Sequence, residues 1–297
     1  MRLSLESAIN YTAQRLWQRM GWFGILRLFT AMGICTAAGF IIARVVGFPL
    51  YPGWQGVFVQ QPVHIAAMGL AGAVVSLLLG LIVSLIIAPP VDMRMPAVVA
   101  ATALLGFSIR GGTMGSVMQA AGGREIFWLL AVELAVLTLL VMLIAVTWRA
   151  LRGSANEAPG AIGTVGLGSG GVQFLATAAM LWVLGQNYQK PQALLSVLFA
   201  AGIGTWVAHF ATGHIWRWAW VVPMIVGIAG YVINAVWATG VDVATIPAAM
   251  RGFSAALPLD YAAMGALGVV LGTLVAHAEM EDMPGSSSNE PKVASQE

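Results

Sequence analysis

Long apolar runs alternate with short polar segments along the whole chain. An apolar run of about 18 residues or more can cross a hydrocarbon core of ~30 Å as a helix. The pattern therefore predicts an all-α, polytopic membrane helix bundle with about eight transmembrane helices, of which the fifth is short. They cover roughly Leu26–Val46, Val63–Ala88, Pro96–Gln119, Ile126–Trp148, Val172–Gly185, Ala193–Phe210, Ala219–Ala238 and Leu259–Ala278.

Residues 1–22 have a different periodicity. Leu5, Ile9, Leu16 and Met20 fall on one helical face, while polar residues fall on another. Together with two arginines and a tryptophan, this pattern is typical of an amphipathic helix that lies in the membrane interface and contacts lipid. A solvated N-terminal helix is the alternative.

Composition supports the membrane interpretation. Apolar residues make up 59% of the 297 residues and charged residues only 9%, whereas soluble domains are about 25% charged. The net charge of +2 comes without the clustered basic residues that a phosphate-binding surface needs, so we expect no nucleic-acid partner. The single cysteine, Cys35, excludes an internal disulfide.

The distribution of Lys and Arg predicts the orientation in the cell membrane. With the N-terminus in the cytoplasm, the inner segments contain an excess of positive residues, as the positive-inside rule requires. Eight spans then return the C-terminus to the cytoplasm. The inner set is Arg2, Arg15, Arg19, Arg27, Arg94, Arg149, Arg152, Arg217 and Lys292, and the outer set is Arg44, Arg124, Lys190 and Arg251.

A Gly-rich stretch, residues 151–171, is interpreted as a cytoplasmic linker between two four-helix halves, residues 23–150 and residues 172–282. The last segment, residues 283–297, has the composition of a disordered cytoplasmic tail. This division predicts five regions, with the N-terminal interfacial helix as the first.

The two halves share weak similarities. Pro62 and Pro191 each stand at the start of the second helix of a half, and Glu125 and Asp260 each precede or open the last helix. This agreement favours a 4+4 internal repeat in which both halves have the same orientation. Chance similarity between apolar helices is the alternative.

No motif indicates an enzyme, a cofactor or a metal centre. The "GLGSGG" stretch matches G-x-G-x-x-G at Gly166, Gly168 and Gly171, but no predicted strand precedes it, as a dinucleotide site would require. Gly-Phe-Ser occurs twice, ending at Ser108 and Ser254, yet no histidine is predicted at the depth of either serine. We therefore expect a protein without catalytic, cofactor-binding or metal-binding residues.

Small residues recur at helical spacing and predict close helix packing. Gly72, Ser76 and Gly80 are four residues apart, and Gly268 and Gly272 form a Gly-x-x-x-Gly motif. Such residues let helix backbones approach closely in lipid. Packing within one bundle is the first interpretation, and a homo-oligomer interface on the last helix is the sharper alternative.

Arg110 is a charge inside a predicted span. If the third helix runs unbroken to about Gln119 and packs against the fourth, Arg110 and Glu133 lie at similar depths, which predicts an intramembrane ion pair. Alternatively, Gly111, Gly112 and neighbouring glycines break the helix at Arg110, and Arg110 then forms an outer vestibule with Arg251.

These alternatives lead to two functional hypotheses. In the first, the protein is a transporter-like or channel-like bundle for a small anion or a lipid. In the second, it is a non-catalytic structural or assembly subunit of a membrane complex. A continuous polar path from Arg110 to the cytoplasm favours transport, and a dry, Leu-packed interior favours the structural role.

Overall fold

The computed structural model describes residues 29–46, 63–87, 95–120, 124–151, 164–216, 218–237 and 252–281, together with Phe23, Leu26 and Arg27. All regular structure within these residues is helical, with no strand among them. After a helix over Phe29–Val45, the elements are α2 (Val63–Ile87), α3 (Met95–Ile109), α4 (Met114–Ala120), α5 (Glu125–Leu151), α6 (Thr164–Leu184), α7 (Lys190–Thr212), η3 (Ala219–Val221), α8 (Val222–Trp237) and α10 (Pro258–Glu281).

Five helical segments in the described residues are long and apolar enough to cross a membrane. They are Glu125–Leu143, Gly166–Leu184, Lys190–Thr212, Ala219–Trp237 and Pro258–Ala276, and two shorter apolar helices cover Phe29–Val45 and Ala67–Val83. The predicted membrane helix bundle is therefore confirmed in its coarse form.

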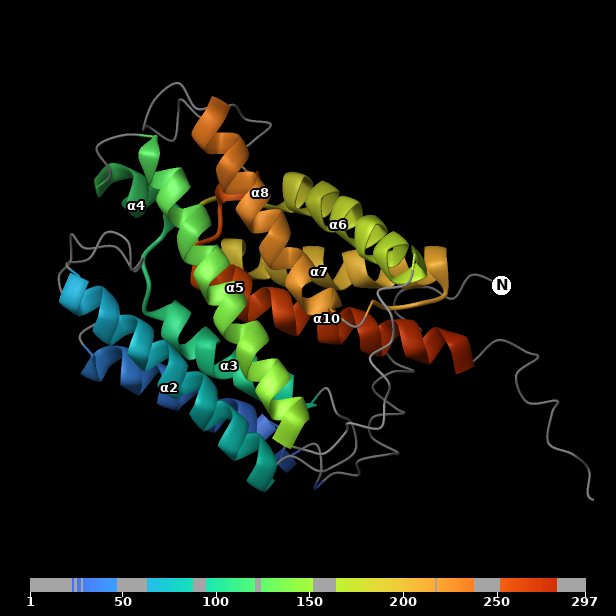
Figure 1. The fold of residues 1–297 in the computed structure, drawn as a ribbon, viewed down its shortest axis with the longest axis horizontal. Helices are drawn as coiled ribbons and strands as arrows, with labels where there is room; N and C mark the ends of the chain where they lie inside the picture. The colour runs from blue at the N-terminus through green and yellow to red at the C-terminus, as the bar shows by residue number, and fades with distance from the viewer. Residues whose placement is uncertain are drawn as a thin grey trace, which may run out of the picture.

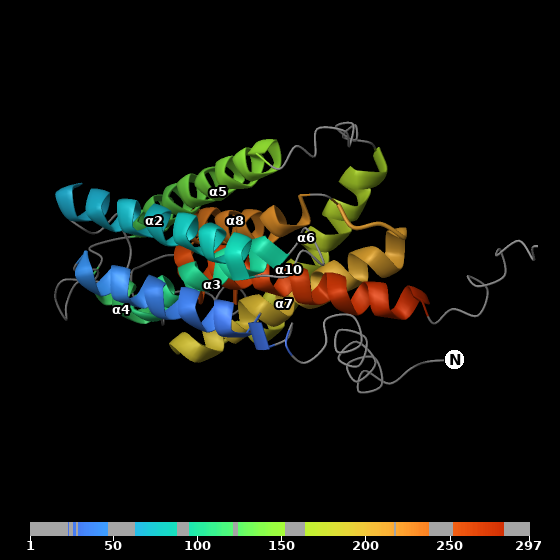
Figure 2. The same ribbon diagram turned by 90° about the horizontal axis from the view of Figure 1, so that it is seen from below.

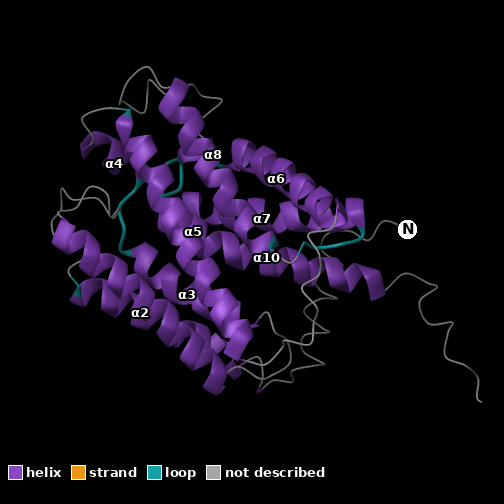
Figure 3. Cartoon of the chain, viewed as in Figure 1, coloured by secondary structure: helices purple, strands orange, loops and turns teal. Residues whose placement is uncertain are grey.

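The predicted third span differs most from the structure. We expected one helix over Pro96–Gln119, but α3 ends at Ile109 and α4 begins at Met114 (Figure 3). The amide of Gly111 donates to the carbonyl oxygen of Ser108 at 2.8 Å, which closes the end of α3 with a turn. Two successive glycines then favour the break, because glycine is costly inside a helix.

Helix α10 lies at the centre of the bundle. It packs against α7 and α3 and, over smaller areas, against α5 and α8. Figures 1 and 2 show it passing between α7 on one side and the α5–α8 pair on the other. Helix α3 packs on α2 and α10, and α5 packs on α8 and α10, so the direct α3–α5 pairing that we expected is not a principal contact. The two halves share one apolar core.

Helices α7 and α10 run parallel and in register. Lys190 contacts Asp260, a Cβ at Gly268 would meet the carbonyl oxygen of Leu198, and a Cβ at Gly272 would meet that of Gly202. Each of these pairs is separated by 70 residues along the chain. The same close approach that buries the glycines therefore also sets Lys190 opposite Asp260.

The Gly-x-x-x-Gly motif on the last helix thus packs against another helix, α7, of the same bundle. Side chains at Gly268 or Gly272 would overlap backbone atoms of α7. Gly72 packs against the ring of Phe107, Ser76 is buried and donates to the carbonyl oxygen of Gly72 at 2.8 Å, and Gly80 is also buried.

A second close crossing was not expected from the sequence. A Cβ at Gly39 would overlap the carbonyl oxygen of Ala103, and one at Gly106 would overlap that of Thr36. The helix over Phe29–Val45 and α3 therefore meet backbone to backbone. Gly39 belongs to a series of buried small residues four positions apart, with Ala31, Cys35 and Ala43, so the spacing on this helix is a signal of close packing that our sequence analysis did not use.

The boundary of the predicted linker is wrong at its C-terminal end. Helix α6 begins at Thr164, so the "GLGSGG" residues are helical. Their glycines make room for an aromatic ring, since Cβ atoms at Gly166 and Gly170 would lie 3.1 and 2.9 Å from the Trp216 indole. The interfacial helix predicted over residues 1–22 and the tail over residues 283–297 lie outside the described residues.

Candidate functional site

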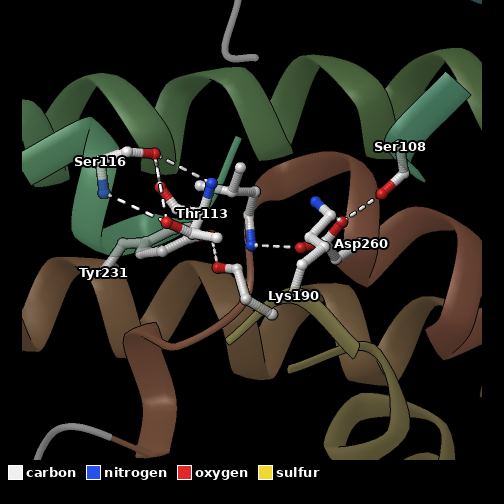
Figure 4. A network of polar contacts seen from close by, with 8 residues as sticks. Ser108, Thr113, Ser116, Lys190, Tyr231 and Asp260 are labelled. Carbon is white, nitrogen blue, oxygen red and sulfur yellow. Dashed lines mark hydrogen bonds and ion pairs between the residues drawn. The ribbon is translucent and has the colours of Figure 1, made fainter. Parts of the chain in front are cut away.

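A buried ion pair lies where three helices meet. The Lys190 ammonium at the start of α7 donates to Asp260 Oδ1 at 2.6 Å, and the Ser108 hydroxyl near the end of α3 donates to the same oxygen (Figure 4). The other carboxylate oxygen, Oδ2, accepts the Leu257 amide at 3.0 Å. Asp260 therefore accepts hydrogen bonds from three donors, which is how a buried carboxylate is stabilised.

Local sequence explains where the two charges lie. Gln189 is extended and Pro191 occupies the first turn, so α7 begins at Lys190, and Gly213, with φ of 69°, ends the helix in the left-handed region. Asp260 lies in the first turn of α10, where a carboxylate interacts favourably with the positive end of the helix. A lysine in the first turn of α7 has the opposite interaction, so Asp260 compensates it.

The two partners differ in access. The Lys190 side chain is 16% exposed, whereas that of Asp260 is 1% exposed. The ammonium is therefore the more accessible of the two charges.

The segment before α10 is largely buried and consists of a short helical turn over residues 252–254 followed by three non-helical residues. Residues 252–257 pass between α6 and α8, where Gly185 and Gly230 let their backbones come close. The Tyr261 hydroxyl donates to the Phe253 carbonyl oxygen at 2.9 Å, and the Tyr231 hydroxyl donates to that of Ala256. The two tyrosine rings meet edge to face, with centroids 6.0 Å apart.

Polar groups also organise the break between α3 and α4. The Thr113 amide donates to Ser116 Oγ at 3.0 Å, and the Ser116 amide donates to Thr113 Oγ1 at 3.3 Å. This reciprocal pattern is a helix N-cap. It fixes the start of α4, where Thr113 and Ser116 lie near Tyr231 and close to the ion pair of Lys190 and Asp260 (Figure 4).

The structure places the predicted charged residues as follows. Arg110 is partly buried just beyond α3, with its guanidinium carbon 5.9 Å from the centre of the Phe40 ring. Glu133 is buried on α5, near enough to Tyr231 to interact electrostatically. Arg251 lies outside the described residues. The Arg110–Glu133 ion pair stays a prediction, but its depth calculation assumed an unbroken helix and is wrong.

The prediction for this pair concerns folding. Arg110→Met or Glu133→Gln alone should reduce the yield of folded protein, because each leaves a charge at membrane depth without its expected partner. The double variant should recover much of that yield. Size-exclusion profiles in detergent give the folded fraction, and a double variant no better than either single variant would contradict the pairing.

Sequence reasoning missed the Lys190–Asp260 pair. The charge distribution places Lys190 in an outer segment, and the comparison of the two halves matches Asp260 only with Glu125. These two positions have different environments in the structure, since Asp260 is buried and Glu125 is exposed. A usable signal was present: Lys190 is one of only two lysines, and it stands directly before a proline at the start of an apolar helix.

No family model, no curated protein and no solved structure matches the chain. The functional inference therefore rests on the geometry of the bundle.

Proposed function

We propose that the protein is a membrane transport protein for a small anion and that Lys190 is the group that binds the anion. The observation that carries the proposal is the Lys190–Asp260 ion pair, buried where the ends of α3, α7 and α10 meet beside the α3–α4 break. Lys190 and Asp260 stand in the first turns of two candidate membrane spans, and charged residues within such spans are costly and commonly mark substrate or ion pathways. Broken helices at the same level are a recurrent feature of transporter binding sites.

The charge of the site favours an anion. The accessible partner is the ammonium, and it lies at the N-terminal end of α7, where the helix dipole also attracts negative charge. Arg110 adds a second positive group just beyond α3, the helix that supplies Ser108.

Transport is tested with the purified protein in proteoliposomes. We expect saturable uptake of chloride, acetate or phosphate above that of protein-free vesicles. Lys190→Gln should reduce this uptake at least about tenfold, because it removes the charge that binds the anion, and Lys190→Arg should retain more of it. Arg124→Gln removes an exposed cation ahead of α5 and is the matched control, with uptake expected to match the unsubstituted protein.

Two results would count against the proposal. Folded protein that takes up none of these anions would not be an anion transporter. Normal uptake by the Lys190→Gln variant would place the anion elsewhere.

A structural role in a membrane complex is the second candidate, and one observation favours it. Polar side chains between α6 and α7 bond within the bundle, since Gln173 donates to Thr205 Oγ1 and to the Ala219 carbonyl oxygen, both at 2.9 Å. Such bonds hold helices together without lining a path. Absence of anion uptake, combined with co-purification of one stable membrane partner from native membranes, would favour this role.

We further propose eight spans with both termini in the cytoplasm and a 4+4 repeat as the origin of the fold. Reporter fusions after Gly160 and at the C-terminal tail should report the cytoplasm. A fusion within the segment Ala244–Ala248 should report the outside. A C-terminal reporter found outside would mean that the number of spans is odd, and the eight-span assignment would fail.

A further inference from the structure

We propose that Asp260 makes the transport proton-coupled: one proton bound by Asp260 accompanies each monovalent anion bound by Lys190. This inference rests on the proposed function and adds the coupling ion. It follows from the charge balance at a site with one ammonium, one carboxylate and almost no access for water on the carboxylate side.

The resting pair is electrically neutral. Asp260 Oδ1 lies 2.6 Å from Lys190 Nζ and so occupies the place beside the ammonium that a substrate anion would take. If an anion displaced it, a carboxylate that is 1% exposed would remain charged beside a second negative charge. A buried charge without its compensating partner is strongly unfavourable. A proton on Asp260 removes this penalty and restores neutrality.

The exchange balances as a single step. The ion pair of Lys190 ammonium and Asp260 carboxylate, with one anion and one proton, becomes an ammonium–anion pair and a neutral Asp260 carboxylic acid. No covalent bond other than the O–H bond on the carboxyl group forms, and no electron is transferred. Release of the anion and the proton on the other side re-forms the resting pair.

The remaining partners of Asp260 suit both protonation states. The Ser108 hydroxyl donates to the carboxylate in the structure, and a hydroxyl can rotate to accept a hydrogen bond from a carboxylic acid. The Leu257 amide bonds the opposite oxygen, Oδ2, and that bond survives protonation of Oδ1. Ser108 is thus a positioning residue for the proton.

Two titratable groups interact electrostatically with Asp260: Tyr231 on α8 and Tyr261 on α10 itself. Of the charged groups on the other helices packed against α10, Glu133 on α5 interacts with Tyr231, and Arg110 follows α3. Each tyrosine hydroxyl donates to a backbone carbonyl oxygen. Asp260 is the acid in direct contact with Lys190, so its charge is the one that anion binding must offset.

The experiment uses the full chain in proteoliposomes with the anion that the uptake assay identifies among chloride, acetate and phosphate. An inward proton gradient should accelerate anion uptake at least about tenfold, and a pH-sensitive dye in the lumen should report acidification during uptake. For a monovalent anion, clamping the membrane potential with valinomycin and potassium should leave the rate unchanged, because the coupled step carries no net charge. Asp260→Asn should abolish the proton dependence and make the remaining uptake sensitive to potential.

Ser108→Ala is a second variant that keeps both charges. It should shift the pH at which uptake is half-maximal while leaving the anion concentration for half-maximal rate within about twofold. Anion uptake that is potential-dependent and moves no protons would overturn the coupling while the transport proposal stands. Proton coupling that persists in Asp260→Asn would overturn the role of Asp260. No anion uptake at all would remove the transport proposal itself.

Discussion

Replacing Lys190 by methionine should destabilise the folded protein by about 3–5 kcal/mol, as is typical when one partner of a buried ion pair is removed. The Asp260 carboxylate is 1% exposed and would keep only Ser108 and Leu257 as donors. Reversible denaturation by SDS in mixed micelles measures the free energy of unfolding directly. Because Lys190 also aligns α7 with α10, we expect this to be one of the two largest effects in the chain.

The reverse substitution should cost less. In Asp260→Asn, the Lys190 ammonium is already 16% exposed and can turn toward water, and an amide oxygen can still accept from Leu257. The expected loss is about 1–3 kcal/mol, the usual penalty for an imperfectly satisfied buried group. The double variant Lys190→Met with Asp260→Asn should lose about 2–3 kcal/mol less than the sum of the two single losses, which is the coupling energy of the pair.

Arg124→Met is the matched control, since it removes an exposed cation. It should change the free energy of unfolding by no more than about 0.5 kcal/mol. Strictly additive losses in the double variant, or a larger loss for Asp260→Asn than for Lys190→Met, would contradict this account of the site.

The positions of the membrane helices follow from the sequence because the bilayer imposes a simple requirement. Every backbone polar group inside it must be bonded within the protein, so a long apolar run has few options besides a helix. The start of α7 agrees with its signals, Pro191 and a preceding polar stretch, to within a few residues. The start of α6 does not follow from the sequence, because a Gly-rich composition predicts a linker whether or not a partner ring is present, and here Gly166 and Gly170 pack against Trp216 within a helix.

Which helices touch is much harder to predict. An apolar side chain has a similar free energy against lipid and against another helix. Hydrophobicity therefore does not indicate which helices pack together. The sequence therefore predicts that the helices of Arg110 and Glu133, now α3 and α5, pack together only because they follow each other closely along the chain. Helix α10 instead packs against both of them, although it lies more than a hundred residues further along the chain.

The candidate site was hidden for the same reason. Asp260, Lys190 and Ser108 come from three helices, and the hydrogen bond between Ser108 and Asp260 joins residues 152 positions apart. A lysine at a helix start looks like a loop residue until the partner helix is placed. The small-residue repeats predict close neighbours without naming them, and the register of the Gly-x-x-x-Gly motif with α7 determines which charges meet.

Replacement of Gly268 or Gly272 by leucine should have the other very large effect. In each case, the first side-chain atom would overlap a backbone carbonyl oxygen of α7, Leu198 for Gly268 and Gly202 for Gly272. Backbone atoms cannot turn aside as a flexible side chain can, so the two helices must separate. We expect a loss of about 3 kcal/mol or more for each variant, at or above the upper end for overpacking in a core.

Separation of the helices should also disturb the ion pair, because Lys190 and Asp260 lie on the same register as the two glycines. Anion uptake should therefore fall together with stability. Gly168→Ala and Gly171→Ala are matched controls on α6: a Cβ at either position meets nothing within 4 Å. Each control should be neutral or stabilising by up to about 1 kcal/mol, as alanine is favoured over glycine in a helix. If Gly268→Leu instead left the free energy of unfolding unchanged and converted a dimer to a monomer, the motif would be an interface between copies of the chain, and its packing against α7 could not be what fixes the register of the ion pair.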